Sequence, residues 1–226
     1  MASLGLLASS LAHEIGTPLG IIRSRAELAE KKAKTLPAVQ EDMKTIVTQI
    51  DRIAKLVKSL LQLARGHKSE NAHAVNLNFI VEDMKTLLSH ELELKDIAFR
   101  CTIDDSTTVK AEPGPLGQVF LNLLVNAVHA IDEERKQGRK GDHKIEILAT
   151  ETSNVVKIVV ADTGCGIPEM HLTQIFKPFF TTKEIGQGTG LGLATTIKLI
   201  VSWGGTIEVK STVGRGTAFE ITLPNK

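Results

Sequence analysis

His13, Glu14 and Thr17 are the first residues whose types and spacing could do chemistry, and Pro18 follows them directly. A neutral imidazole has one ring nitrogen with a free lone pair, which can attack phosphorus. A neighbouring carboxylate can hold the other ring nitrogen and steady the positive charge that develops. Thr17 is four residues after His13 and therefore lies on the same helix face. The segment predicts a phosphate acceptor, with a solvated surface histidine as the alternative.

Asp162 follows an apolar run at residues 155–161 and is itself followed by Gly164 and Gly166. A carboxylate at the end of a strand can accept a hydrogen bond from the amino group of a flat heterocycle. Glycines at this place let the backbone approach the ring edge, because they have no Cβ atom. The alternative is a tight turn with a solvated aspartate.

A second glycine-rich loop resembles a phosphate cradle that runs into a helix, where free N–H groups and the helix dipole favour anions. Its residues are Gly186, Gly188, Thr189, Gly190, Leu191 and Gly192. It matches neither a Rossmann fingerprint nor a P-loop, and a flexible hinge is the alternative. Lys177 and Lys183 precede this loop and could reach phosphates, although each alone is typical of a solvated surface.

Asn122 and Asn126 lie four residues apart, on one face of a helix expected at residues 115–134. Asparagine within an apolar stripe needs a hydrogen-bonding partner. A metal–phosphate group is one such partner, and a buried backbone group is the other. Together with the two glycine-rich loops, this pair predicts a nucleotide site.

The composition excludes several other classes of protein. The 226 residues carry a formal net charge of +1, which offers no footprint for nucleic acid or an anionic membrane. By sequence alone, no apolar run approaches the ~18–20 residues of a membrane span, and the first residues lack the basic segment of a signal peptide. The two cysteines, Cys101 and Cys165, show no metal-binding spacing and indicate a reduced cytosolic chain.

The elements that must position these groups fall into two parts, in which apolar residues recur at different spacings. Residues 1–66 carry apolar positions at alternating spacings of three and four, and a turn near Pro37 divides them into two helices. Such a hairpin cannot cover its own apolar stripe, so we expect a homodimeric four-helix bundle through residues 1–66. Residues 67–76 are polar and are expected to form a linker.

Residues 77–226 alternate helical and strand-like patterns, which predicts an α+β two-layer sandwich rather than a doubly wound sheet. The helices are expected at residues 79–94, 115–134 and 191–203. The strands are expected at 97–103, 144–150, 155–161, 206–210 and 217–223, with a hairpin joining the second to the third.

In this order the motifs resemble the core of a sensor histidine kinase, a phosphotransfer hairpin followed by a GHKL-type ATP-binding domain. His13 lies in a segment similar to the H box, and the segments similar to the N, G1, F and G2 boxes are 122–130, 162–168, 175–180 and 186–193. A terminal glycine box follows at 214–217. The Pro-Phe-Phe-Thr-Thr-Lys run at 178–183 looks closest to the nitrogen-regulator-like branch.

The resemblance implies a role for each part of the site. Asp162 would bind the adenine amino group with help from Thr217, and Asn126 would hold Mg²⁺ on the phosphates with Asn122 nearby. Residues 166–190 would form a mobile lid, with Lys177 or Lys183 near the phosphates. His13 would be phosphorylated by ATP with the aid of Glu14 and would pass the group to an aspartate of a response regulator receiver domain. Thr17 would help to dephosphorylate that regulator.

Two other functions fit parts of this pattern. Related ATPases and clamps use a glutamate base four residues before the metal-binding asparagine, and that position here is Asn122, which cannot take a proton. A catalytically inactive nucleotide-binding scaffold is the second alternative, and the intact set of His13, Glu14, Asn126 and Asp162 disfavours it. Gly16 and His129 depart from the common pattern of the family without removing a required group. We expect a cytoplasmic core, and this expectation allows a parent protein that is attached to a membrane.

Overall fold

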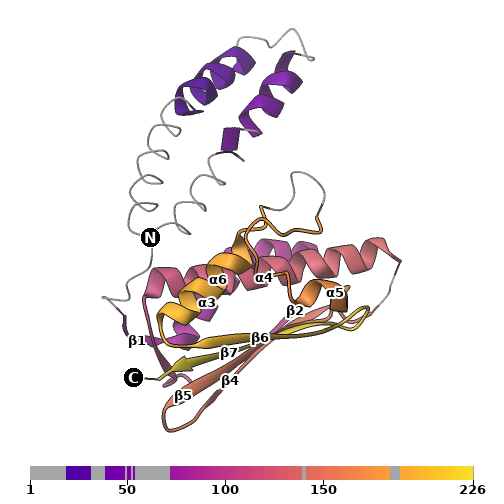
Figure 1. The fold of residues 1–226 in the computed structure, drawn as a ribbon. Coiled ribbons are helices and arrows are strands. Elements are labelled where there is room, and N and C mark those ends of the chain that lie inside the picture. Colours follow the sequence, from indigo (N-terminus) through magenta and orange to yellow (C-terminus); the bar gives the residue numbers. More distant parts are fainter. Residues whose placement is uncertain are drawn as a thin grey trace. The chain divides into compact units, whose positions relative to one another are not determined.

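The computed structural model describes residues 19–31, 39–48, 50–51, 53, 72–138, 141–183 and 189–225. The chain divides into two compact units (Figure 1). One contains residues 1–66 with 181–191, and the other contains residues 67–180 with 192–226. His13, Glu14, Thr17, Gly186 and Gly188 lie outside the described residues.

The first unit contains a helical hairpin, as the sequence predicts. Residues 19–31 and 39–48 are helical, and so are 50–51 and 53. The Arg23 guanidinium donates to Glu27 on its own helix at 2.9 Å and to Asp51 on the other helix at 2.7 Å. Ala26 and Ile50 are each only 6% exposed, so they belong to the packed side of the hairpin. The apolar period of the sequence thus correctly indicates two helices, and the turn expected near Pro37 lies outside the described residues.

The second unit is built on a five-stranded sheet with the order β2-β4-β5-β7-β6. Its strands are β2 (Ala98–Thr102), β4 (Lys144–Glu151), β5 (Val155–Asp162), β6 (Thr206–Thr212) and β7 (Gly216–Pro224). Only the β2–β4 pair of this sheet is parallel, and β4 and β5 form the expected antiparallel hairpin. A separate pair joins β1 (His73–Asn76) to β3 (Thr108–Ala111). β1 therefore occupies part of the stretch that the sequence assigns to a linker.

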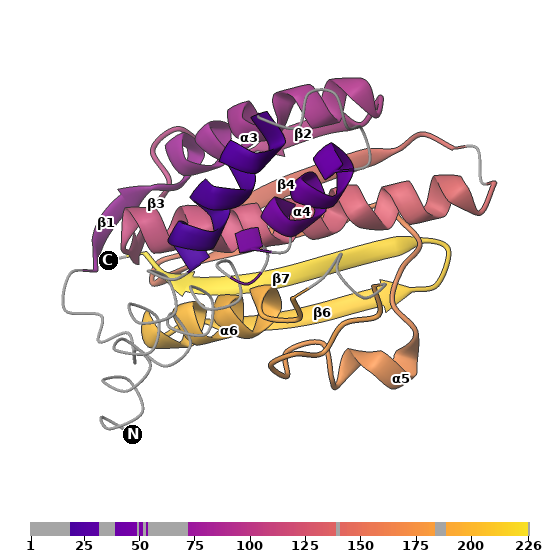
Figure 2. The same ribbon diagram turned by 90° about the horizontal axis from the view of Figure 1, so that it is seen from above.

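The long helices of this unit lie over one face of the sheet (Figures 1 and 2). They are α3 (Leu77–Leu94), α4 (Pro113–Lys136) and α6 (Gly192–Ser202), and the short α5 (Glu169–Leu172) follows β5. The Asn76 side chain caps α3 by accepting from the Phe79 N–H at 2.9 Å. Proline in the first turn starts α4, where its missing N–H costs no helical hydrogen bond. The two-layer α+β sandwich predicted from the sequence is confirmed.

Helix α4 forms the centre of the helical layer. Its 24 residues include an 18-residue window with a mean hydropathy of 1.3, so among the described residues it alone meets the length and composition of a membrane span. No such segment was expected from the sequence. Half of that window is buried inside the fold. Because α4 packs against α3, α6 and β5, it is a core helix, and its apolar character is explained by burial.

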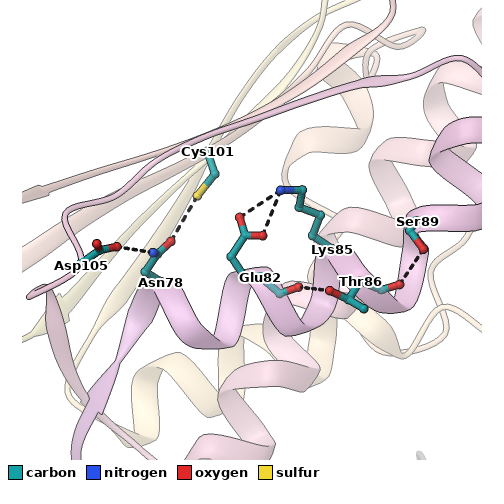
Figure 3. A network of polar contacts seen from close by, with 7 residues as sticks. All are labelled: Asn78, Glu82, Lys85, Thr86, Ser89, Cys101 and Asp105. Carbon is teal, nitrogen blue, oxygen red and sulfur yellow. Dashed lines mark hydrogen bonds and ion pairs between the residues drawn. The ribbon is translucent and has the colours of Figure 1, made fainter.

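The side of α3 nearest to β2 carries a polar network (Figure 3). The Asn78 amide donates to the Asp105 carboxylate at 2.7 Å and accepts a weak hydrogen bond from the Cys101 thiol at 3.8 Å. One turn further along the helix, Lys85 pairs with Glu82 at 2.9 Å. The network thus links α3 to β2 and to the turn that follows it. Its surface ion pair adds little stability in water.

Candidate nucleotide site

Asp162 is the last residue of β5. It is the first member of a row of polar residues that crosses three neighbouring strands. The register pairs Asp162 with Thr217 of β7, and Thr217 with Ser211 of β6. The two preceding rows on the same sheet face are apolar, and they consist of Val160, Phe219 and Val209, then Ile158, Ile221 and Ile207. The inner face of the sheet therefore changes from apolar to hydrogen-bonding at the Asp162 end. We call Asp162, Thr217 and Ser211 the polar row.

Burial and two hydrogen bonds act in opposite directions on the pKa of the Asp162 carboxyl group. Burial raises its pKa from the usual 3.8 to about 6, because a charge in an apolar region loses its hydration. The backbone N–H groups of Gly164, at 2.8 Å, and Thr217 donate to the carboxylate and limit this rise. The group is therefore mostly ionised at pH 7 and is a hydrogen-bond acceptor that the fold keeps away from water. Asp162 is therefore not a solvated aspartate in a turn.

The two glycines after Asp162 serve close packing with the protein itself. A Cβ atom on Gly164 would lie 2.5 Å from the backbone carbon of Ala130 in α4. Gly166 has a φ of +73°, and a Cβ atom there would lie 2.3 Å from the Thr212 carbonyl oxygen. The Cys165 N–H donates to Ala130 O at 3.0 Å. The glycines therefore seat the loop against α4 and β6, a different reason from the approach to a ring edge that the sequence suggests.

Ser211 belongs to the polar row, although the sequence did not indicate it. Its hydroxyl accepts from the Ile167 N–H at 2.8 Å, donates to the Gly216 carbonyl at 2.9 Å and contacts the Thr217 hydroxyl at 2.9 Å. It follows Ile207 and Val209 on the inward side of β6, where a third apolar residue is the ordinary pattern. One polar residue at an inward position of an alternating strand is the sequence signal that could have indicated Ser211.

Asn122 links α4 to the start of α6. Its amide nitrogen donates to the Gly192 carbonyl at 3.1 Å and to the Thr196 hydroxyl at 3.3 Å, while its oxygen accepts from Gln118 at 2.9 Å. Thr196 is fully buried. The carboxamide thus finds protein partners for both its donor and its acceptor, and one of them is the first residue of the helix that follows the second glycine-rich loop.

Asn126 lies one helical turn beyond Asn122 in α4 and is half-buried. Within the described ranges, no group of three or more histidine, cysteine, aspartate or glutamate residues could hold a metal ion. A neutral amide oxygen still suits Mg²⁺, which takes few protein ligands and completes its shell with phosphates and water. The side-chain chemistry of Asn126 therefore fits a magnesium ion shared with a phosphate ligand.

Lys177 lies in the segment after β5, and the predicted residues Lys183, Thr189, Gly190 and Leu191 belong to the first unit. Lys177 is exposed, and Phe179 combines a φ of +66° with 61% exposure. The His171 and Phe180 rings lie 5.4 Å apart. Residues 181–191 group with the first unit, where the Lys183 N–H donates to Thr181 and the Leu191 N–H to Thr189, at 3.2 and 3.3 Å. Gly190 has a positive φ of 65°.

Neither cysteine is activated. Burial raises the pKa of the Cys165 thiol, and the negative charges of Asp162 and Glu134 raise it further. Burial also raises the pKa of Cys101. Since the thiolate is the reactive form, both groups are poor nucleophiles at neutral pH.

The fold and the site together define a class of protein, a helical hairpin followed by an α/β sandwich with a buried acceptor carboxylate at a strand end. Residues 111–226 match the family described as "Histidine kinase-, DNA gyrase B-, and HSP90-like ATPase". Residues 3–68 match the "His Kinase A (phospho-acceptor) domain". The chain therefore belongs to the histidine kinases and carries a phospho-acceptor domain and an ATP-binding domain of this family.

Individual relatives agree with this assignment. The sensor histidine kinase ZraS of Salmonella typhi is 37% identical over 226 residues, which are 99% of this chain and 46% of ZraS. The chain thus spans about half the length of that relative. The crystal structure of full-length ShkA with AMPPNP has a TM-score of 0.80 at 25% identity, covering 98% of this chain and 46% of ShkA. The histidine kinase ThkA, solved with the response regulator TrrA, has a TM-score of 0.66 at 26% identity, with 100% and 63% covered.

Proposed function

We propose that the chain is the catalytic core of a two-component sensor histidine kinase. It transfers the γ-phosphoryl group of ATP to His13 and then to an aspartate of a response regulator receiver domain. The observation that carries this proposal is the buried Asp162 carboxylate, held by two backbone N–H groups, in a chain whose residues 3–68 match a phospho-acceptor domain. The site of ShkA with AMPPNP and the complex of ThkA with TrrA support both halves of the reaction by analogy.

The base end of the site is the polar row. The ionised Asp162 carboxylate accepts a hydrogen bond from the adenine amino group, and Thr217 lies beside it as the second contact. Because Gly164 and Thr217 donate backbone N–H groups to Asp162, the carboxylate keeps one orientation without help from solvent. Such preorganisation lowers the entropy that binding loses.

The phosphate end is formed by α4 and the second glycine-rich loop. Asn126 would hold Mg²⁺, which would supply positive charge to offset the charge of the phosphates. Asn122 acts here through Gly192, which it holds at the start of α6. By the resemblance, backbone N–H groups of the second glycine-rich loop would contact the phosphates, and the lysines Lys177 and Lys183 would add positive charge. The loop residues are Gly186, Gly188, Thr189, Gly190, Leu191 and Gly192. Residues 166–190 form the lid over the nucleotide.

The transfer step forms a bond between a His13 ring nitrogen and the γ-phosphorus, and it breaks the bond to the oxygen that leaves with ADP. Glu14 accepts a hydrogen bond from the other ring nitrogen and so balances the charge of the imidazolium. In the second step the regulator's aspartate takes the phosphoryl group and frees His13. Thr17 orients the water that later hydrolyses the regulator's acyl phosphate.

Water is a poor competitor for this phosphoryl group because position 122 carries an asparagine in place of a glutamate base. An ATPase of this family would need a carboxylate at position 122. The amide there cannot take a proton, and it already donates to Gly192 and Thr196. This contact set favours transfer to a side chain over the alternatives of a hydrolytic clamp and an inactive scaffold.

The hairpin is proposed to form the homodimer. Ile22, Ile46 and Ile53 are 50%, 38% and 42% exposed in a single chain, although they belong to its apolar stripes. A second copy packed into a four-helix bundle would cover them. We propose residues 1–66 as the dimerisation and phosphotransfer domain, 67–76 as the linker and 77–226 as the catalytic domain. The assembly works in the cytoplasm, and its phosphate-end motifs suggest the nitrogen-regulator-like branch.

The decisive experiment incubates the wild-type chain and His13→Gln with γ-labelled ATP and Mg²⁺. We expect an acid-labile label on the wild type alone, since phosphorylated imidazole hydrolyses in acid. Equal labelling of both proteins would show that His13 is not the acceptor. Adding a receiver domain should then move the label from the kinase, and Thr17→Ala should slow only the later loss of label from the receiver.

A further inference from the structure

The Ser211 hydroxyl lies at the meeting point of three segments that surround the base end. It accepts from the Ile167 N–H at 2.8 Å, in the loop that follows Asp162. It contacts the Gly216 carbonyl and the Thr217 hydroxyl on β7, each at 2.9 Å. All of these groups belong to the second unit, and Thr217 is only 5% exposed. A single hydroxyl therefore joins the loop after β5 to the strand that faces Asp162.

The direction of each hydrogen bond follows from counting protons. A serine hydroxyl has one proton and two lone pairs. The Ile167 N–H occupies one lone pair, and the Gly216 carbonyl can only accept, so it takes the Ser211 proton. The contact between Ser211 and Thr217 then needs a proton from Thr217. Thr217 has no other proton on its oxygen, and it is left with two lone pairs.

The base end therefore presents hydrogen-bond acceptors. The Asp162 carboxylate is one, and the Thr217 oxygen becomes the second because Ser211 uses its proton. A purine with a 6-amino group brings two N–H donors to this edge, which match two acceptors. A purine with a 6-oxo group keeps one donor at N1 but brings an oxygen lone pair to position 6, where acceptor would face acceptor.

We propose that Ser211 is a positioning residue that fixes the Thr217 hydroxyl as an acceptor and so makes the site select 6-amino over 6-oxo purine nucleotides. This inference rests on the proposed function, since it takes the polar row as the end of the site that binds the base. Ser211 acts through Thr217 and does not touch the nucleotide. In its absence the Thr217 hydroxyl is free to rotate and donate its proton to a 6-oxo group.

The test compares the affinities of ATP and ITP, which differ in the group at position 6 of the ring and in the N1 proton that only ITP carries. Calorimetry on the full chain with Mg²⁺ would use the wild type, Ser211→Ala, Thr217→Val and the double variant. Thr206→Ala is the matched control, because Thr206 is an exposed residue of the same strand. We expect the wild type to prefer ATP by about 100-fold or more, since a site that is built for donors rejects an acceptor strongly.

Ser211→Ala should lower this preference about tenfold, the value of roughly one hydrogen bond, and Thr206→Ala should leave it unchanged. The double variant should show the same preference as Thr217→Val, within about twofold, because Ser211 has no route to the base except through Thr217. A purely structural role for Ser211 predicts instead that ATP and ITP binding weaken by the same factor. That result, or additive losses in the double variant, would overturn the proposal.

Two further outcomes separate this inference from the proposed function. If the wild type binds ATP and ITP equally, the selectivity is absent and the inference is wrong, while the kinase proposal still stands on ATP binding. If neither nucleotide binds, both proposals fail. Ser211→Cys fills nearly the same volume with a weak hydrogen-bonding group, so it should reproduce the lost preference even where Ser211→Ala does not fold.

Discussion

The two ends of the candidate site are held together by different kinds of interaction. At the base end, neighbouring strands set the polar row of Asp162, Thr217 and Ser211 by their register, and backbone groups supply most of the contacts. At the phosphate end, the side-chain amide of Asn122 joins α4 to the beginning of α6. The base end is therefore part of the folded core, whereas the phosphate end depends on side chains that link separate helices.

This difference predicts that the largest effect on stability comes from the backbone beside the polar row. Gly216 has a φ of +109°, and a Cβ atom there would lie 1.9 Å from the Asp162 carbonyl oxygen. Gly216→Ala must therefore separate β7 from β5, and we expect it to lower the free energy of unfolding by about 3 kcal/mol or more. Urea unfolding followed by the fluorescence of Trp203, the only tryptophan, measures this loss.

Gly114→Ala is the matched control for that experiment. Gly114 lies in the first turn of α4 with a negative φ, and nothing lies within 4 Å of its Cβ position. Alanine favours a helix over glycine, so the unfolding free energy should stay the same or rise by about 0.5–1 kcal/mol. Equal losses in the two variants would mean that the close approach at Gly216 is not what constrains the base end.

Replacing Asp162 should change nucleotide binding and folding stability in opposite directions. Its pKa is raised to about 6 in the folded protein and is near 3.8 in the unfolded chain, so the folded state holds a proton there between about pH 4 and pH 6 that the unfolded state has released. The unfolding free energy contributed by this group therefore falls as the pH rises through that window. Asp162→Asn removes the buried charge and should stabilise the domain by about 2 kcal/mol at pH 7–8, with little gain at pH 4.

The same substitution should weaken ATP binding by about 100-fold or more, because an amide cannot match a charged acceptor in a buried site. Calorimetry with ATP and thermal unfolding at pH 4, 6 and 8 measure the two effects. Asp83→Asn, at an exposed position of α3, should change neither. An Asp162→Asn protein that is both less stable and still binds ATP would contradict the assignment of this residue to the base.

Replacing Asn122 should weaken binding of the phosphates without weakening binding of the base. Asn122→Ala removes the hydrogen bonds to Gly192 and Thr196, so we expect the unfolding free energy to fall by about 1–2 kcal/mol. The start of α6 would loosen, and ATP affinity should fall about tenfold while adenosine affinity stays unchanged. Thr196→Val, which removes only the longer of the two contacts, should have a smaller effect. A parallel loss of adenosine binding would show that the two ends are not separate.

The sequence predicted the parts of this molecule that follow from local pattern. The hairpin, the main helices and the five strands of the large sheet could be read from apolar spacing, because burial of one face imposes a period on each element. The place of Asp162 at the end of a strand could also be read, because a charged residue and glycines follow an apolar run. β1 could not, since its four residues carry one buried side chain and are stabilised by pairing with the distant β3.

Contacts between segments explain what was missed at the site. The role of Ser211 depends on the register of β6 with β7, which no local pattern contains. Asn122 was expected to meet either a metal–phosphate group or a buried backbone group, and only the packing of α4 on α6 places the Gly192 carbonyl within its reach. The same is true of Gly164 and Gly166, whose spacing was visible but whose neighbours, Ala130 and Thr212, were not.

The smallest predicted effect concerns Cys165, which reports on the charge at the base end. Its raised pKa comes first from burial and then from the charge of Asp162. Asp162→Asn removes that second contribution, so the thiolate fraction should rise and alkylation by iodoacetamide at pH 8 should be about twofold faster than in the wild type. Cys101 is the internal control, because burial and Glu82 raise its pKa and its rate should not change. Mass spectrometry of the two peptides separates the sites. An unchanged Cys165 rate would mean that Asp162 carries no charge at this pH, and it would then have to act at the base end as a hydrogen-bond donor.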